Sequence, residues 1–284
     1  MSVAPPPLPS IILDPIVRLA LSEDLGRAGD LTTDATIEPG TQLTAHIQAR
    51  KTGILAGMDA AAYALKLVDD CVALDQKIED GSRLSPGQTI AVMMGSARSI
   101  LIAERTMLNF LGRLSGIATQ TETYAAAIAH TKAKVVCTRK TTPGHRAVEK
   151  RAVRCGGGTS HRYGLDDAIL IKDNHIAACG SIPEALQRAH AYAGHLRMIE
   201  IEVDTLAQLE EALPHKPHAV LLDNMPPDIL REAVAMIDGQ CLAEASGGIT
   251  LETIAAVAET GVDYISVGAL THSAINLDVG LDIL

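Results

Sequence analysis

Aromatic side chains are nearly missing from this 284-residue sequence, which has five Tyr, one Phe and no Trp. A surplus of positive charge is missing too, since 24 Lys and Arg stand against 34 Asp and Glu, for a formal net charge of -10. Proteins that stack bases or grip a duplex need aromatic platforms or a basic surface. These two shortages argue against a nucleic acid as the partner.

Disulfide motifs, membrane spans and a secretion signal are also missing. No apolar run is long enough to cross a bilayer, and the N-terminal stretch MSVAPPPLPS lacks the basic and apolar regions of a signal peptide. No C-x-x-C pair occurs among the five cysteines, which indicates free thiols in a reducing compartment; they are Cys71, Cys137, Cys155, Cys179 and Cys241. We therefore expect a cytoplasmic protein with no membrane partner, whose N-terminal stretch is a loose arm.

Alternating strand and helix patterns follow residue 130. Hydrophobic residues make up 47% of the chain, enough for one large α/β domain or two modest ones. Helical patterns separate most of six short apolar runs, which are AKVVCTRK, DAILIKDNH, MIEIEVD, HAVLLDNM, CLAEASGG and DYISVGAL. This alternation predicts parallel strands joined by helices, as in an α/β barrel, complete or nearly so. An open doubly wound sheet is the alternative, but no G-x-G-x-x-G follows an early strand.

Charged residues and glycines mark the ends of these predicted strands. In an α/β barrel the chemistry lies at the C-terminal strand ends, where the loops converge. The residues found there are Arg139, Lys140, Lys172, Glu202, Asp223, Ser246, Gly247, Gly248 and Gly268. The alternative is that these charges only decorate a rim. We interpret them as candidate site residues.

A basic block lies between Thr138 and Arg162. It holds seven of the 24 basic residues within 25 positions, and its only acid is Glu149. A solvated helix face would explain Arg146, Lys150 and Arg154, which are spaced four apart. It does not explain two basic residues at a strand end or the pair His161-Arg162 after three glycines. Because guanidinium groups match carboxylates and phosphates, the block predicts a ligand rich in negative charge.

Late glycine loops and two acids extend this picture. SGGI precedes a predicted helix and GALTHSA follows the last predicted strand, so backbone N–H groups there can approach a phosphate. Glu202 and Asp223 have two possible roles. They form internal salt bridges to Lys172 or Arg139, or they hold Mg²⁺ or sugar hydroxyls. Together these features predict a site that binds two ligands, a phosphorylated sugar and an acid.

Several stretches resemble the nicotinate-nucleotide pyrophosphorylase (quinolinate phosphoribosyltransferase) family. The resemblance covers all but the first ten or so residues. It rests on SEDLGRAGDLTTDAT, AERTMLNFLGRLSGIA, TRKTTPG, RCGGGTSHRYGLDDAILIKDNH, EIEVDTL, LLDNM, EASGGI and ISVGALTHSA. It implies an N-terminal α/β sandwich domain over residues 1–115, with which a tail at about 275–284 packs, and a C-terminal α/β barrel-like domain with parallel strands over 116–274. It also implies the conversion of quinolinate and phosphoribosyl pyrophosphate to nicotinate mononucleotide, pyrophosphate and CO2, with Mg²⁺, in NAD biosynthesis.

The resemblance also implies roles for single residues. The quinolinate ligands would be Arg105 from a neighbouring subunit and Arg139, His161, Arg162 and Lys172. Lys140, Glu202 and Asp223 would face the sugar pyrophosphate, with Glu202 and Asp223 on the metal, and these three with Lys172 would be the catalytic residues. The 5′-phosphate would be bound by Ser246, Gly247, Gly248, Gly268 and His272. We expect a homodimer with shared active sites, and a higher oligomer stays open.

Three residues depart from the family pattern, and three other readings of the sequence stay open. The departures are Cys137, where an acid is common, Ser160, where Asn is common, and His145, where an apolar residue is usual. One alternative function is a barrel lyase or aldolase that uses Lys172 as a Schiff-base amine. Another is a non-catalytic anion-binding or assembly protein. The third is a related phosphoribosyltransferase-like protein found with molybdate transport genes, which we expect to match the glycine-rich block less well.

Overall fold

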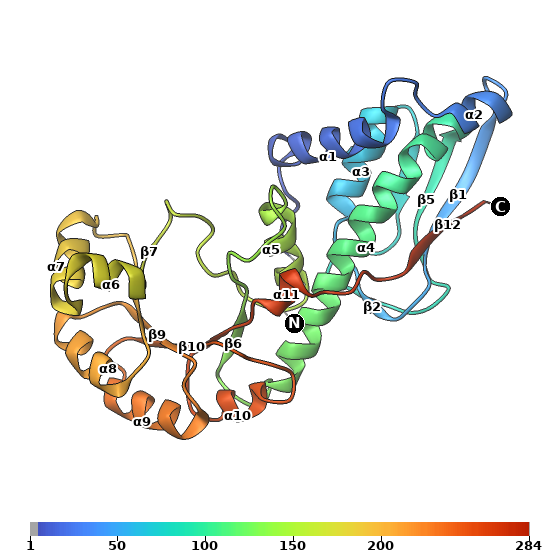
Figure 1. The fold of residues 1–284 in the computed structure, drawn as a ribbon. Helices are drawn as coiled ribbons and strands as arrows, with labels where there is room; N and C mark the ends of the chain where they lie inside the picture. The colour runs from blue at the N-terminus through green and yellow to red at the C-terminus, as the bar shows by residue number, and fades with distance from the viewer. Residues whose placement is uncertain (1–4, 284) are drawn as a thin grey trace. The chain divides into compact units, whose positions relative to one another are not determined.

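The computed structural model describes residues 5–283 (Figure 1), and the chain forms two compact units. The first unit combines residues up to Glu122 with residues 141–157 and 270–284. The second unit combines residues 123–140 and 158–269. These units are defined by compactness, so the domain boundary expected between residues 115 and 116 stays a prediction. None of the helices within residues 5–283 is both long enough and apolar enough to cross a membrane.

The first unit contains an antiparallel sheet with the strand order β12-β1-β5-β3. The strand β12, the last element of the chain, pairs with β1, so the C-terminal tail belongs to this sheet. A separate two-stranded pair is formed by β2 and β4. The strands are β1 (Gln42–Ala49), β2 (Gly53–Ile54), β3 (Ala73–Gln76), β4 (Arg83–Leu84), β5 (Thr89–Ser96) and β12 (Val279–Ile283).

Helices make up the rest of the first unit. The long apolar pattern after residue 96 forms a single 31-residue helix, α4, in which Ile100, Met107 and Leu111 are buried. Asp30 begins α2 by accepting a hydrogen bond from the backbone N–H of Thr33 at 3.0 Å, a typical N-cap. The helices are α1 (Ser10–Leu25), α2 (Leu31–Thr36), α3 (Met58–Val68), α4 (Ala97–Ala127) and α5 (Arg146–Cys155).

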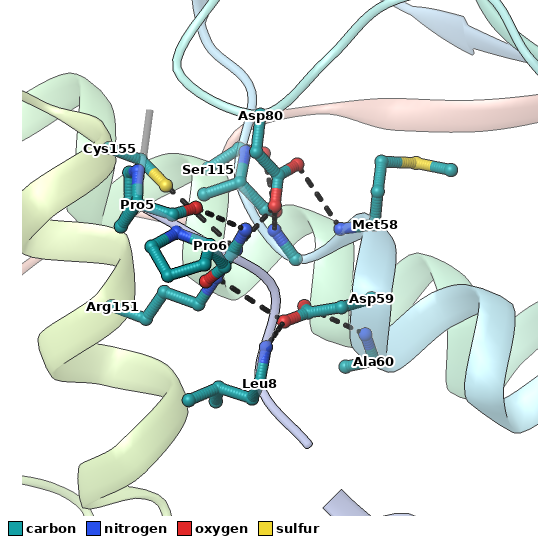
Figure 2. A network of polar contacts seen from close by, with 12 residues as sticks. Pro5, Pro6, Leu8, Met58, Asp59, Ala60, Asp80, Ser115, Arg151 and Cys155 are labelled. Carbon is teal, nitrogen blue, oxygen red and sulfur yellow. Dashed lines mark hydrogen bonds and ion pairs between the residues drawn. The ribbon is translucent and has the colours of Figure 1, made fainter. Parts of the chain in front are cut away.

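The expectation of a loose N-terminal arm is wrong for residues 5–8 of the chain (Figure 2). The guanidinium of Arg151 donates hydrogen bonds to the backbone carbonyls of Pro6 at 3.0 Å and Pro5 at 3.2 Å. The backbone N–H of Leu8 donates to Asp59 at 2.9 Å. Proline has no N–H of its own, so its carbonyl is the only backbone group that this arm offers at those positions.

The second unit is built on a six-stranded parallel sheet with the order β6-β11-β10-β9-β8-β7. All six predicted strands are present, and helices follow them on the outer side in Figure 1. The strands are β6 (Lys134–Val136), β7 (Ile169–Ile171), β8 (Ile199–Val203), β9 (Ala219–Asp223), β10 (Leu242–Ser246) and β11 (Tyr264–Ser266). The remaining elements are α6 (Asp173–Cys179), α7 (Ile182–Tyr192), α8 (Leu206–Ala212), the 3-10 turn Leu213–His215, α9 (Pro227–Ile237), α10 (Ile254–Ala258) and α11 (Ala269–His272). The α/β fold class is confirmed.

Side-chain alternation gives this sheet one apolar and one polar face. Along β8, Ile199, Ile201 and Val203 are buried on one face, so Glu200 and Glu202 lie on the other. The strand register carries the same polar face across the sheet, since Glu244 on β10 aligns with Leu221 on β9, which aligns with Glu202. The polar face therefore collects charged groups from several strands.

Candidate active site

Two segments that carry predicted site residues lie side by side in the second unit. Thr159 forms a parallel bridge with Val136 of β6, and its backbone N–H donates to the carbonyl of Val135 at 2.8 Å. The N–H of Cys137 donates in return to the carbonyl of Thr159 at 3.2 Å. Arg139 and Arg162 each lie three positions after the bridged residues, so both arginines are at the same end of the sheet.

The guanidinium of Arg162 has a backbone partner, and the residue is partly buried. Its Nη1 donates to the carbonyl of Ala168 at 3.3 Å, while its Nε is buried without a hydrogen-bond partner within residues 5–283. Burial, and next the nearby positive charge of Arg139, lower the pKa of the Arg162 guanidinium. Two like charges are thus brought together, an arrangement that a bound anion would stabilise.

Two of the three consecutive glycines have structural roles at the end of α5. A Cβ atom on Gly156 would collide with the Ala118 carbonyl and the Thr121 side chain, so only glycine fits there. Gly157 adopts a left-handed φ of +84°, the usual way to end a helix such as α5. The two glycines therefore pack and terminate α5.

Lys172 and Glu202 form an ion pair across β7 and β8. The register places Ile171 opposite Ile201, so these two residues are the next facing pair at the strand ends. Asp223, which ends the neighbouring strand β9, accepts a hydrogen bond from the Asn224 amide at 2.6 Å. The internal salt bridge, one of the two alternatives, thus exists between Glu202 and Lys172, and both acids remain on the polar face of the sheet.

Two buried acids that the sequence analysis missed surround His161. Its Nε2 lies 3.1 Å from Glu200 Oε2 and 3.3 Å from Glu244 Oε1. Burial by itself lowers the pKa of His161, but the two carboxylates outweigh it and raise that pKa to about 10. Burial, and also the charge of Glu200, raise the pKa of Glu244. The period-2 alternation in MIEIEVD and CLAEASGG is the signal that would have found these acids.

The predicted phosphate loop has the backbone that its glycines suggested, but no adjoining helix. Gly247 and Gly248 both have left-handed φ, +92° and +61°, and a Cβ on Gly247 would strike Asn224. The helix expected directly after SGGI is α10, which begins only at Ile254. Ser246 and Gly268 are half-buried at the ends of β10 and β11. A phosphate contact at the SGGI loop therefore depends on loop N–H groups, whereas Gly268 directly precedes α11.

Three further predicted residues are exposed. Lys140 lies in the second unit, and its backbone N–H donates to Thr138 Oγ1 at 3.0 Å. Arg105 and His272 belong to the first unit, where Arg105 is on α4 and His272 contacts the Ser273 hydroxyl at 2.7 Å. Their exposure leaves these three side chains accessible to a ligand or a partner.

The alternative of a solvated helix face is wrong for Lys150 of the basic helix α5, although Arg154 is exposed. Lys150 is buried, and Arg146 is half-buried with a hydrogen bond to Thr141 at 3.1 Å. The buried carboxylate of Glu149 accepts hydrogen bonds from Arg113 at 3.0 Å and from the Thr142 hydroxyl at 2.8 Å. Most of the positive charge of α5 is therefore structural.

Within residues 5–283, two groups of three side chains have the spacing to hold a metal ion. One is the exposed cluster Asp69, Asp70 and Cys71, and the other is His161 with Glu200 and Glu244. Neither group contains Glu202 or Asp223. Mg²⁺ commonly takes only one or two carboxylates and completes its shell with water and substrate phosphates, so this pair still fits such an ion.

The three departures from the family pattern leave the proposed ligands in place. Cys137 is buried at the end of β6, and Ser160 is exposed. His145 stacks on Phe110 with ring centroids 6.3 Å apart, so its imidazole replaces an apolar side chain in a packed position.

A barrel-like parallel sheet whose polar face gathers arginines, a lysine and acids defines an enzyme-type site for a small, multiply charged ligand. Comparison with known proteins identifies the family. The chain matches the models described as "Quinolinate phosphoribosyl transferase, N-terminal domain" over residues 30–115 and "Quinolinate phosphoribosyl transferase, C-terminal domain" over residues 117–282. The chain belongs to the quinolinate phosphoribosyl transferase family.

Individual relatives agree with this assignment. The chain is 47% identical over 275 residues to a nicotinate-nucleotide pyrophosphorylase (carboxylating) of Mycobacterium leprae, covering 94% of this chain and 95% of the relative. It is 45% identical to a probable enzyme of the same name from Bacillus subtilis, covering 92% and 90%. The solved structure of the nicotinate-nucleotide pyrophosphorylase from Francisella tularensis superimposes with a TM-score of 0.94 at 38% identity, covering 98% of each chain.

Proposed function

We propose that this protein transfers the phosphoribosyl group of phosphoribosyl pyrophosphate to quinolinate, with loss of CO2, and so makes nicotinate mononucleotide for NAD biosynthesis. Family membership and the names of the relatives support the reaction. The structural observation that carries it is the proximity of two positive charges, those of Arg139 and Arg162. The buried Nε of Arg162 also has no hydrogen-bond partner within residues 5–283. Quinolinate is a small aromatic dicarboxylate, the kind of anion that two guanidinium groups can bind.

The reaction needs orientation more than it needs a nucleophilic side chain. The pyridine nitrogen forms a bond to C1 of the sugar while the bond from C1 to pyrophosphate breaks, and the electron pair leaves with pyrophosphate. The 2-carboxylate then departs as CO2, its bonding electrons remain on the cationic ring, and a proton from solvent replaces it. Arg139, Arg162 and Lys172 would hold the dicarboxylate so that its nitrogen faces C1. Lys140 would stabilise the charge that develops on the leaving group.

We further propose that Glu202 and Asp223 hold Mg²⁺ together with the substrate. Both carboxylates lie on the same face of adjacent strands. Glu202 is opposite Leu221, and Asp223, two residues after Leu221, points to the same side of the sheet. Bound Mg²⁺ would neutralise charge on the pyrophosphate group. Lys172 already pairs with Glu202, so it would help to fix that carboxylate for the ion.

The assembly and the cellular place of the protein are further proposals. A homodimer would let Arg105, which is exposed on α4, reach the active site of the second copy. The phosphate of the sugar would be bound by Ser246, Gly247, Gly248, Gly268 and His272. The free cysteines of residues 5–283 support a reducing, cytoplasmic environment.

The Schiff-base alternative has less support. Lys172 is paired with a carboxylate and is 44% exposed, whereas Schiff-base lysines are usually desolvated or next to another cation. Borohydride trapping with a carbonyl substrate would detect such an adduct, and we expect none.

The reaction is tested by mixing the protein with quinolinate, phosphoribosyl pyrophosphate and Mg²⁺ and measuring CO2 and pyrophosphate together. We expect both products in equal amounts and only when both substrates are present. The same assay with EDTA tests the metal requirement, and gel filtration with light scattering tests the dimer. Absence of CO2 release from a folded protein would overturn the proposed reaction.

A further inference from the structure

Glu200 and Glu244, which form a cluster with His161, have no assigned purpose in the proposed chemistry. The side chains of Glu200 and Glu244 are 11% and 7% exposed, and that of His161 is 12% exposed. Burying carboxylates costs free energy unless their partners compensate for lost hydration. A core of this size could be filled by apolar side chains, so two acids at these positions call for a specific partner, and the His161 ring is that partner.

The three side chains converge from elements far apart in the sequence. Glu200 projects from β8 and Glu244 from β10, whereas His161 lies in the segment that pairs with β6. Their ligand atoms all lie within 4.8 Å of one another. The carboxylate of Glu244 also has a side-chain hydrogen bond with Ser266 on β11. The imidazole is therefore fixed between two strands of the sheet.

The other ring nitrogen of His161 connects this cluster to Arg162. The backbone N–H of Arg162 donates to Nδ1 at 2.8 Å. A protonated Nδ1 cannot accept a hydrogen bond, so in this arrangement the ring proton is on Nε2, between the two carboxylates. The two carboxylates raise the pKa of His161 and burial raises the pKa of Glu244, so the three side chains titrate as one cluster.

Both nitrogens of His161 thus have protein partners, and its predicted contact with quinolinate stays a prediction. We propose that Glu200 and Glu244 are positioning residues: they clamp His161, and His161 fixes the backbone of Arg162 so that its guanidinium is presented to a substrate carboxylate. The inference rests on the proposed function, because it names the support of a quinolinate ligand. The nearby Ala168 carbonyl holds the other end of the Arg162 side chain.

Substitutions at Glu244 test the clamp in the full-length protein. Glu244→Leu removes the contact with Nε2 at similar volume, Glu244→Asp withdraws the carboxylate by one methylene, and Glu244→Gln keeps an oxygen acceptor in place. We expect Leu and Asp to raise the KM and Kd for quinolinate by about tenfold or more, with Gln close to the wild type and the KM for phosphoribosyl pyrophosphate changed by less than about twofold in all three. Thr260→Val, which removes a buried hydroxyl elsewhere in the second unit, is the matched control.

A double-mutant cycle separates positioning through Arg162 from other roles. If the clamp acts through Arg162, Glu244→Asp should weaken quinolinate binding in the wild type and add no further loss in an Arg162→Ala background. Additive losses would overturn the proposal, as would unchanged quinolinate affinity in Glu244→Asp, or equal weakening of both substrates. The wild-type assay separates the two levels of inference, because an inactive wild type refutes the proposed reaction, and an active one with unaltered Glu244 variants refutes only the clamp.

Discussion

Lys172 directly follows Ile171, which pairs with Ile201, and its side chain forms an ion pair with Glu202, the residue after Ile201 on β8. Glu202 is 11% exposed in this pair and Lys172 is 44% exposed. The relationship joins the proposed quinolinate ligand to the proposed metal ligand. A change at either residue should therefore alter the handling of both substrates.

The first prediction concerns Lys172→Met. We expect kcat/KM for quinolinate to fall by about 100-fold, or about 2.7 kcal/mol, because an orienting cation and the partner of Glu202 are both lost. The stability loss should be only about 1 kcal/mol, since the lysine is half exposed. Steady-state kinetics and urea unfolding measure the two effects. Lys132→Met, which breaks an exposed ion pair with Asp263 in the same unit, should leave kcat/KM unchanged.

The second prediction concerns the two arginines. Arg139→Ala and Arg162→Ala should each weaken quinolinate binding by about 100-fold, because each removes a charge-assisted contact to a carboxylate. Phosphoribosyl pyrophosphate binding should change by less than about threefold in both. Calorimetric titration with each substrate measures these constants, and Arg188→Ala on α7 is an exposed control. Equal loss of both substrates in a folded variant contradicts the assignment.

The third prediction concerns nicotinate, which lacks the second carboxylate. A site that pairs both carboxylates leaves cations unmatched when one is missing. We expect kcat/KM for nicotinate to be lower than for quinolinate by a factor on the order of 10⁴. Pyrophosphate release with each acid measures the ratio. Comparable rates would show that the arginines do not distinguish a dicarboxylate from a monocarboxylate.

The sequence was sufficient to locate the strands of the second unit and the charged residues at their ends. Short apolar runs of four to eight residues bounded by turns are a local signal, and so is a cation directly after such a run. The facing pair Lys172 and Glu202 also follows once the strands are placed in parallel register. These features are predictable because they involve residues that are close in the chain or that lie on neighbouring strands of one sheet.

Other features depend on partners far apart in the chain, and the sequence pattern did not show them. Arg151 was counted only as one residue of the basic block, but its acid partners lie 71 and 92 residues away, at Asp80 and Asp59. Glu200 and Glu244 were treated only as members of apolar strands. Their partner His161 comes from a loop that is distant in the sequence, so the pattern gave no sign of the contact. A buried charge is recognisable only when its counter-charge has been placed.

The fourth prediction concerns pH and His161. The folded pKa of about 10 exceeds the ordinary value of 6.5, so the cluster stabilises the fold fully below pH 6.5. That contribution declines as the pH rises from 6.5 towards 10, because the unfolded chain releases the proton first. Urea unfolding of the wild type and of His161→Gln should therefore converge over this range. A stability difference that stays constant or grows with pH contradicts the raised pKa.

The fifth prediction concerns Arg151 and the N-terminal arm. Its guanidinium contacts Asp80 at 2.5 Å and Asp59 at 3.3 Å, and all three side chains are at most 9% exposed (Figure 2). Arg151→Met should lower the free energy of unfolding by about 3–5 kcal/mol, because two carboxylates remain buried without their cation. Arg154→Met, one turn along α5 at an exposed position, should change it by less than about 0.5 kcal/mol.

The same substitution should also release the arm, since Arg151 holds the carbonyls of Pro5 and Pro6. Limited proteolysis followed by mass spectrometry should show faster cleavage near Leu8 in Arg151→Met than in the wild type or in Arg154→Met. Deleting residues 1–7 removes only two of the bonds to Arg151 and leaves both ion pairs, so it should cost less than Arg151→Met. If the deletion costs as much as the substitution, the arm and not the buried ion pairs stabilises this part of the first unit.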